Sequence, residues 1–347
     1  MSRVGHNDGS KGSMMFTLKT MLYFTGGATI FFCTSFAIAA KRHAPPVRAA
    51  GLAKLEMQVL LDRAGFSPGE IDDESGKNSR EALTAFEAAR GHAPGEPNHK
   101  ELLKALRAGA AKPIVSYSIT AEDASGPFIQ TIPGDMTEKS KLVGLYYTSV
   151  LEKLGEKFHS APALLSRLNP RARFAAGEHI RVPNVLGAPQ ESPIATHAAG
   201  FDGRREPAET GIVKVVVSKK TSILTVSSGK GEVIFHAPVT SGSAHDPLPL
   251  GNWVVTLVQH NPAYNYNPEL FWDANPANAK ATIAAGPNNP VGVVWIEINK
   301  AHYGIHGTPE PGRIGYSESH GCVRLTNWDA VKLAGLVKKG TVVVFEE

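Results

Sequence analysis

Two short stretches near the C-terminus say most about the fold: YGIHGT at residues 303–308 and SHGCVRL at residues 319–325. Each places glycine beside a residue able to do chemistry, and each adjoins apolar residues typical of buried strands. The two stretches therefore predict a reactive site within a β-rich domain.

The sequence around them, from residue 211 onward, alternates apolar and polar residues as half-buried strands do. The predicted strands are 213–217, 222–226, 233–239, 253–258, 291–298 and 341–345. One helix is expected after Thr326, which with Asp329 forms a capping-box-like start. Its apolar face holds Ala330, Leu333, Ala334 and Val337, and Gly340 should end it. We therefore predict a mostly β domain at 211–347 with one C-terminal helix, of ordinary domain size.

Cys322 is the candidate nucleophile of this domain. An ordinary thiol with a pKa of about 8.5 is mostly protonated at neutral pH, and only the thiolate attacks well. A neighbouring imidazole can accept the proton and give a thiolate–imidazolium pair, and His306 and His320 are both candidates. An inert buried cysteine is the alternative. The concentration of histidine and glycine around Cys322 favours catalysis.

Acyl transfer also needs backbone N–H groups that converge on a developing oxyanion. Gly321 leaves the backbone beside Cys322 uncovered, which suits that role. Arg324 lies two residues after Cys322, so on a strand the two side chains share a face. Its guanidinium could bind a substrate carboxylate bidentately, or it could be an ordinary structural ion-pair partner.

A metal site is the rival chemistry, since His302, His306, His320 and Cys322 include zinc-type ligands. His302 and His306 would converge only on a helix, whereas four residues of strand separate side chains by about 13 Å. No Cys-x-x-Cys or His-Glu-x-x-His motif accompanies them. We therefore expect no metal.

The N-terminal residues 1–40 have the pattern of a secretory signal peptide. Lys11 and Lys19 precede an apolar run at 21–37, and Ala37-Ile38-Ala39 provides an A-x-A-like cleavage site. An uncleaved membrane anchor is the alternative, and it would be the chain's contact with a membrane. Cleavage would remove Cys33 and leave Cys322 as the sole cysteine of a periplasmic or otherwise extracytoplasmic protein.

Residues 52–110 have helical periodicity and are expected to form a small three-helix domain. The apolar faces are Leu52, Leu55 and Val59, then Ala82, Phe86 and Ala89, then Leu102 with Leu106. The segment from Gln58 to Phe86 resembles the peptidoglycan-binding-domain-1 family, although Asp73 stands where that family usually has glycine. The resemblance implies wall binding, and a simple helical spacer is the alternative.

Residues 111–190 are expected to form an α+β module, with strands at 114–120 and 177–184 and helices at 147–158 and 161–168. The end of this segment, with Leu168-Asn169-Pro170 and Ile180-Arg181-Val182-Pro183, is similar to the second half of a LysM glycan-binding repeat. A connecting module without glycan binding is the alternative. Residues 187–210, rich in Ala, Pro and charges, are expected to be a linker.

The C-terminal motifs carry the most specific resemblance. His306-Gly307-Thr308, Gly315 and the SHGCVRL stretch resemble the signature of the YkuD-type L,D-transpeptidase catalytic domain. Segments 249–251 and 286–292 support the match, which covers 211–347. The resemblance implies a β-rich fold without a metal or organic cofactor.

The same resemblance implies a two-step reaction on peptidoglycan. Cys322 would attack the carbonyl at the L-centre of residue 3 of a tetrapeptide stem, release D-Ala, and pass the acyl group to an amine. His306 would be the base, oriented by the Gly307 carbonyl. Further roles are implied for His320 (catalysis, shaping the oxyanion region), the backbone of Gly321, Cys322 and Gly307 (oxyanion), Ser319 (holding the loop or contacting substrate), and Arg324 and Tyr303 (substrate binding).

The acyl acceptor stays open. A second stem would give a 3→3 cross-link, an amine of an outer-membrane protein would give a tether, and water would make the protein a carboxypeptidase or amidase. A non-enzymatic wall-binding scaffold is an alternative of another class. The expected partners are the stem peptides and glycan of the wall. The net charge of +4, without a basic stripe interleaved with aromatics, gives no reason to expect nucleic acid.

Overall fold

The computed structural model describes residues 49–92, 106–107, 112–185, 212–275 and 277–347. The predicted signal peptide or anchor at 1–40, the linker at 187–210 and most of the third helix near 102–106 lie outside the described residues. Within the described ranges, no helix combines the length and apolarity needed to cross a membrane. The chain from Pro45 to Glu347 forms one compact unit.

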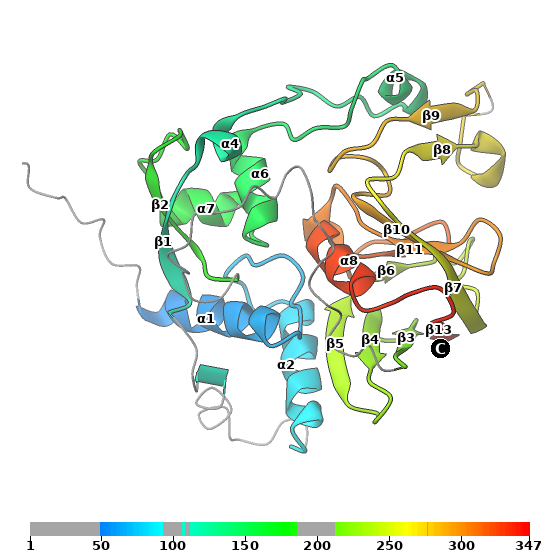
Figure 1. Ribbon diagram of the computed structural model, residues 1–347, viewed down its shortest axis with the longest axis horizontal. Helices are drawn as coiled ribbons and strands as arrows, with labels where there is room; N and C mark the ends of the chain where they lie inside the picture. Colours follow the sequence, from blue (N-terminus) through cyan, green and yellow to red (C-terminus); the bar gives the residue numbers. More distant parts are fainter. Residues whose placement is uncertain (1–48, 93–105, 108–111, 186–211, 276) are drawn as a thin grey trace, which may run out of the picture. The chain divides into compact units, whose positions relative to one another are not determined.

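A nine-stranded sheet dominates the C-terminal part (Figure 1), in the order β5-β4-β3-β13-β7-β10-β11-β12-β6. Its strands are β3 (Lys214–Ser218), β4 (Ile223–Ser227), β5 (Val233–Pro238), β6 (Thr240–Ser241), β7 (Gly251–His260), β10 (Val294–Ile298), β11 (Gly304–His306), β12 (Val323–Arg324) and β13 (Val342–Glu346). The pairs β3–β13 and β11–β12 are parallel, and the other pairs are antiparallel. The mostly β prediction for this part is confirmed.

The core of the sheet explains why these segments form strands. Alternate residues such as Val215, Val217, Leu224 and Val226 are fully buried, while their neighbours are partly exposed, so each strand buries one face. Helix α8 (Asn327–Ala334) adds Ala330 and Leu333 to this core. Two short 3₁₀ helices, η1 (Pro268–Leu270) and η2 (Pro311–Arg313), and the separate hairpin of β8 (Tyr264–Tyr266) and β9 (Ala281–Ile283) complete this part.

Helix α8 starts as predicted but ends early. The Thr326 hydroxyl accepts a hydrogen bond from the Asp329 N–H, as an N-cap does. The helix ends at Ala334, with Gly335 as its C-cap, and not at Gly340. Glycine is a poor helix former, so Gly335 stops the helix at the first opportunity. Val337 is nevertheless buried, from the turn that follows.

The two N-terminal helices, α1 (Ala49–Arg63) and α2 (Lys77–Ala89), pack through Leu61, Phe66 and Phe86. Ala89 was expected on this buried face, but it is exposed because it lies in the last turn of α2. The loop after α1 pairs with β5, the edge strand of the large sheet. Ser67 N–H donates to the His236 carbonyl (2.8 Å), and His236 N–H donates to the Gly65 carbonyl (2.9 Å). The helical part thereby covers an edge that would otherwise present unpaired backbone groups.

The middle part is α+β, as predicted. Strands β1 (Ile114–Ser118) and β2 (His179–Pro183) pair antiparallel. Helices α6 (Val150–Lys157) and α7 (Pro162–Leu168) pack on them around Ile119, Phe158 and Val182. Two shorter helices, α4 (Ala121–Ala124) and α5 (Met136–Ser140), precede α6.

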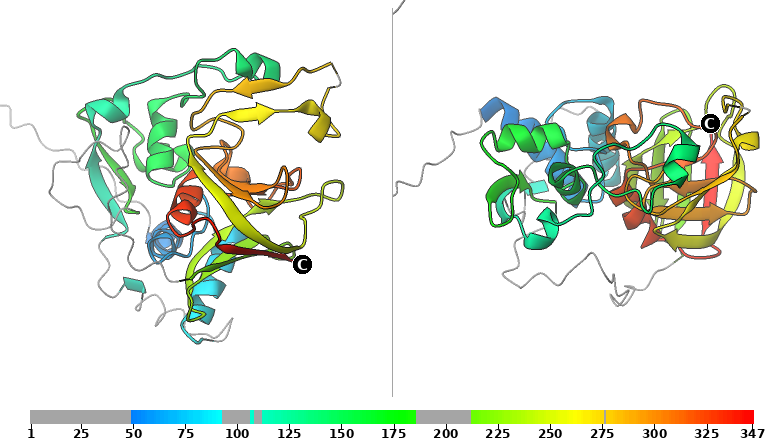
Figure 2. Two further views of the ribbon diagram at one scale, coloured as in Figure 1. Left: turned by 45° about the vertical axis from the view of Figure 1, so that its right-hand side comes forward. Right: turned by 90° about the horizontal axis from the view of Figure 1, so that it is seen from above.

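Residues 127–147, here called the strap, leave this middle part after α4 and return to it before α6. Figures 1 and 2 show the strap running out to the β8–β9 hairpin, with α5 beside β9. A hydrogen bond from the Ile129 N–H to the Tyr147 carbonyl (2.9 Å) closes its base. No sequence pattern indicates that this segment reaches the C-terminal part.

Both N-terminal parts meet α8. The Ser67 hydroxyl donates to the buried Asp329 carboxylate (2.8 Å), and the His159 ring stacks on Trp328 (5.1 Å between centroids). Burial raises the pKa of Asp329 to about 6, and the Ser67 hydrogen bond opposes that rise.

We expect Ser67→Ala to lower the free energy of unfolding by about 1–3 kcal/mol, because it removes a donor from a buried carboxylate. It also leaves the Gly69 N–H without its acceptor, the Ser67 hydroxyl. Urea unfolding measures the loss. The exposed Ser75→Ala is the matched control and should change stability by less than about 0.5 kcal/mol. Equal effects of the two substitutions would contradict a stabilising contact between Ser67 and α8.

Candidate active site

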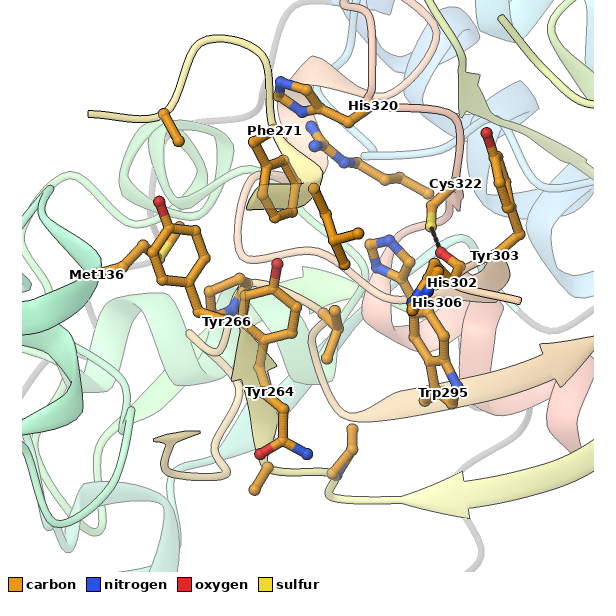
Figure 3. A pocket seen from close by; sticks show the side chains of 18 of the residues that line it. Met136, Tyr264, Tyr266, Phe271, Trp295, His302, Tyr303, His306, His320 and Cys322 are labelled. Atoms are coloured by element: carbon orange, nitrogen blue, oxygen red, sulfur yellow. Dashed lines mark hydrogen bonds between the residues drawn. The ribbon is translucent and has the colours of Figure 1, made fainter. Parts of the chain in front are cut away.

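Cys322 and His306 line one open pocket of about 860 Å³, drawn in Figure 3. One wall comes from β10, β11, β12 and the turn before β12. The opposite wall comes from the β8–β9 hairpin, with Tyr264, Tyr266 and Phe271, and from the strap, with Met136. The pocket therefore joins residues that are far apart in the sequence.

The pairing of β11 with β12 brings the reactive side chains together. The strands run parallel, with Ile305 opposite Val323 and His306 opposite Arg324. Ile305 and Val323 point into the core and are fully buried, so the alternating residues face the pocket. Cys322 precedes Arg324 by two residues and shares its face. The Cys322 thiol and the His306 ring therefore line the same pocket, on neighbouring strands.

The hydrogen bonding of His306 determines its tautomer. Its Nδ1 lies 2.7 Å from the Gly307 carbonyl oxygen, which can only accept, so Nδ1 carries the proton. Nε2 then has a free lone pair and can act as a base. The ring is buried and stacks on Trp295, the residue opposite it on β10 (5.5 Å between centroids). These contacts fix the ring plane.

Electrostatics keep both reactive groups neutral before substrate binds. Burial, reinforced by the nearby Arg324 cation, lowers the pKa of His306 to about 3. Burial also raises the pKa of Cys322, against smaller opposite effects of the Gly304 backbone and Arg324. The thiol donates a weak hydrogen bond to the His302 carbonyl, with sulfur and oxygen 3.7 Å apart. Both shifts favour a neutral thiol and a neutral imidazole at rest over the thiolate–imidazolium pair.

The backbone around Gly307 is already occupied. Its N–H donates to the Val294 carbonyl (3.2 Å), so the expected oxyanion role of the Gly307 N–H is not supported. Its carbonyl holds His306, as expected. The N–H groups of Gly321 and Cys322 are left as the candidate oxyanion donors.

Asn327, the first residue of α8, supports the same region. Its Oδ1 accepts a hydrogen bond from the Val293 N–H (3.1 Å), and its Nδ2 donates to the Pro287 carbonyl (3.1 Å). A Cβ on Gly292 or on Gly307 would collide with the Asn327 amide oxygen. Glycine at both positions lets α8 approach the backbone that orients His306.

Gly321 is required by both its conformation and its surroundings. Its φ of +96° is in the region that L side chains rarely adopt. A Cβ there would lie 2.5 Å from Cε1 of Tyr303, whose ring packs against the turn. Tyr303 itself lines the pocket.

Ser319 lies beneath the turn and is almost fully buried. Its hydroxyl donates to the Cys322 carbonyl (2.6 Å) and accepts from the Gly242 N–H (2.7 Å). Both contacts hold the turn that carries Cys322. This geometry favours the loop-holding role over substrate contact.

His320 lines the pocket but turns toward the hairpin. Its Nε2 lies 2.9 Å from Oδ1 of Asp273, and its ring meets Phe271 edge-on (5.0 Å between centroids). Residue chemistry alone left both His306 and His320 open as the base, and the family resemblance implied His306. The structure separates them, since His306 has a free Nε2 in the pocket and His320 is paired with a carboxylate.

Arg324 faces the pocket and makes no hydrogen bond or ion pair within the described part of the chain. Burial lowers its pKa from the ordinary value, because the charged form loses hydration. A half-buried guanidinium without a partner is well suited to bind a carboxylate. Across the described ranges, no group of three or more His, Cys, Asp or Glu side chains could hold a metal ion.

Several pocket residues were missed from the sequence. Trp295, Asn327 and the His302 carbonyl act through contacts that no local motif encodes. The hairpin and Met136 reach the site only by tertiary packing. The GPNNPVG segment at 286–292 was the one available signal for the Asn327 contacts.

Comparison with known proteins gives nearly the same bounds for the C-terminal domain as the sequence analysis did. Residues 212–345 match the model of the YkuD family, described as the L,D-transpeptidase catalytic domain. YqjB of Bacillus subtilis, named as an L,D-transpeptidase, is 31% identical over 140 residues, which are 38% of this chain and 70% of that protein. The chain belongs to the L,D-transpeptidase family.

Another relative extends the similarity beyond the catalytic domain. The Bacillus subtilis protein named L,D-transpeptidase YkuD is 28% identical over 193 residues, 55% of this chain and 90% of its own length. The aligned 55% of this chain is longer than residues 212–345, so the alignment also includes residues that precede the predicted linker at 187–210. A solved L,D-transpeptidase from Mycobacterium smegmatis is 21% identical, with a TM-score of 0.32. It covers 39% of this chain and 59% of its own, and this low likeness adds nothing to the sequence match.

The neutral resting pair of this transpeptidase predicts a particular pH dependence. In a Cys33→Ala background, alkylation of Cys322 by iodoacetamide should rise about tenfold per pH unit up to at least pH 8.5, because only the thiolate reacts. The rate at neutral pH should be below that of glutathione, whose thiol serves as the ordinary reference. A fast plateau between about pH 5 and 7 would show a resting thiolate and contradict the assignment.

Gly321→Ala should slow acylation of Cys322 by at least about tenfold, because the methyl group displaces Tyr303 or the turn. Gly340→Ala is a matched control. Gly340 also has a positive φ (+91°), but a Cβ there meets nothing within 4 Å. It should cost about 1 kcal/mol of stability and leave the acylation rate unchanged. Mass spectrometry of the acyl-enzyme over time measures both, and equal rates in the two variants would rule out the steric explanation.

Proposed function

We propose that this chain is a peptidoglycan L,D-transpeptidase whose nucleophile is Cys322 and whose base is His306. One observation carries the proposal. The β11–β12 register puts the thiol and the imidazole on one pocket face, and the Gly307 carbonyl leaves Nε2 of His306 free. Family membership adds the reaction class.

In the first step, the Cys322 sulfur attacks the carbonyl carbon at the L-centre of residue 3 of a tetrapeptide stem. The thiol proton passes to Nε2 of His306, and the carbonyl oxygen becomes an oxyanion that the Gly321 and Cys322 N–H groups stabilise. The C–N bond to D-Ala then breaks, and His306 returns its proton to the leaving amine. The product is a thioester on Cys322 and free D-Ala.

In the second step, an amine attacks the thioester carbonyl and gives its proton to His306. The C–S bond breaks, and the thiolate regains a proton from the imidazolium. Because the resting groups are neutral, charge separates only while substrate fills the pocket and excludes water. Arg324 binds a carboxylate of the stem, and Tyr303 packs beside it.

The N-terminal parts suit a role in wall binding. The helical part keeps the pattern of the peptidoglycan-binding-domain-1 family, and Asp73 adopts a φ of +69° where that family usually has glycine. Aspartate tolerates this conformation better than most residues, so its presence is compatible with the same turn. We assign glycan contact to the LysM-like part and extracytoplasmic action to the whole protein.

Incubation with purified tetrapeptide muropeptides under reducing conditions should produce a covalent adduct on Cys322 and release D-Ala. Mass spectrometry detects both products, and Cys322→Ala should give neither. Supplying a second stem, a lysine-ended peptide or water alone then ranks the acceptors. Wild-type protein that forms no adduct would sink the transpeptidase proposal and leave the wall-binding scaffold.

A further inference from the structure

The roles predicted for the middle part, glycan binding or connection, do not account for the strap. The strap packs against the catalytic part. Its Leu145 is fully buried in one apolar cluster with Tyr266 of β8 and Ile283 of β9. Ile132, Met136 and Leu142 of the strap pack against the same cluster. The hairpin that forms the far wall of the pocket therefore rests on the strap.

The strap is also hydrogen-bonded to the turn that follows the hairpin. Leu145 N–H donates to the Ala285 carbonyl (3.0 Å), and Asn288 N–H donates to the Leu145 carbonyl (2.9 Å). The Asn288 side chain donates to the Tyr146 carbonyl (2.9 Å). Gly286 has a φ of +146°, and a Cβ there would collide with the Leu145 backbone. The turn is thus shaped to receive the strap.

On its other side, the hairpin reaches the catalytic turn. Asp273 pairs with His320, and Trp272 stacks on His245 of the β6–β7 connection (4.6 Å between centroids). Asp273 and Trp272 follow η1 and have exposed fractions of 48% and 61%, so these two contacts are solvent-accessible. Exposed contacts of this kind contribute little stability, which leaves the buried strap contacts as the main support of the hairpin.

The strap also supplies part of the pocket surface. Gly134, Asp135 and Met136 line the cavity, and Figure 3 shows Met136 next to Tyr266, across the cavity from Cys322. Between these ends lie Tyr264 and Phe271. The acyl donor is covalently joined to Cys322 between the two steps, so its remaining length has to lie in the cavity connected to the thiol. A flexible thioether and aromatic rings suit an alkyl side chain of that donor.

We propose that the strap is a specificity-determining part of the transpeptidase site: it holds the hairpin in place and binds the acyl-donor stem at the end of the pocket away from Cys322. This inference rests on the proposed function for the identity of the donor. The strap lies within residues 111–190, the predicted LysM-like part, but this inference gives it a role in substrate binding at the catalytic pocket. Met136 contacts the stem, and Leu142 and Leu145 position the hairpin.

Met136→Ala and Leu142→Ala test the proposal, with Val143→Ala as the matched control. Val143 belongs to the same strap but is 91% exposed and contacts neither cluster nor pocket. In a Cys322→Ala background, calorimetry gives the dissociation constant of a tetrapeptide muropeptide. We expect Met136→Ala to weaken donor binding by about tenfold. Leu142→Ala should speed hydrogen exchange in β8 and β9 by at least about threefold, because buried apolar contacts protect the hairpin.

Val143→Ala should match the parent protein in both measurements. The inference would be overturned if all three variants had the same donor affinity and the same rate of hydrogen exchange in β8 and β9. With Cys322 intact, a Met136→Ala variant whose KM changes only for the acceptor amine would overturn the assignment to the donor stem. A different outcome would refute the proposed reaction alone: the Cys322→Ala protein binds the tetrapeptide, but the wild-type protein forms no adduct on Cys322. The strap inference would then stand on the binding and hydrogen-exchange results.

Discussion

The parallel pairing of β11 with β12 is the constraint on which the active site depends. Its register puts His306 opposite Arg324 and, through strand alternation, brings Cys322 onto the same face. A shift of one residue would turn the thiol and the guanidinium into the core and expose Val323. Because Ile305 and Val323 are fully buried, such a shift would be strongly unfavourable. The hydrophobic core thus determines the catalytic geometry.

The second requirement is a fixed orientation of His306, the proposed base. Gly307 accepts the Nδ1 proton of His306 through its carbonyl, and its N–H is held by Val294. Asn327 packs against Gly307 and Gly292 from the start of α8. Helix α8 is in turn contacted by the helical part through Ser67 and by the α+β part through His159. Both N-terminal parts therefore support the element that abuts the base.

Burial has a consequence for the chemistry. A pair that is neutral at rest does not have to keep separated charges in a desolvated pocket. In the proposed reaction, transfer of the thiol proton must therefore accompany attack by the sulfur. The unpartnered Arg324 beside the pair lowers the basicity of His306 further until an anionic group binds to it. Substrate carboxylate on Arg324 would relieve that effect, so binding and activation of the base are linked by charge.

The sequence by itself determined the β-rich class of the C-terminal part and most of its strands, and it singled out Cys322 and His306 as the candidate reactive pair. These features are local, since alternation fixes strands and a contiguous motif carries the chemistry. It did not determine which histidine is free or that the Gly307 N–H is occupied. It also missed the hairpin, Trp295 and the strap as walls of the pocket. Only the tertiary structure decided these points, because they depend on contacts between segments up to about 190 residues apart, such as Met136 and Cys322 around one pocket.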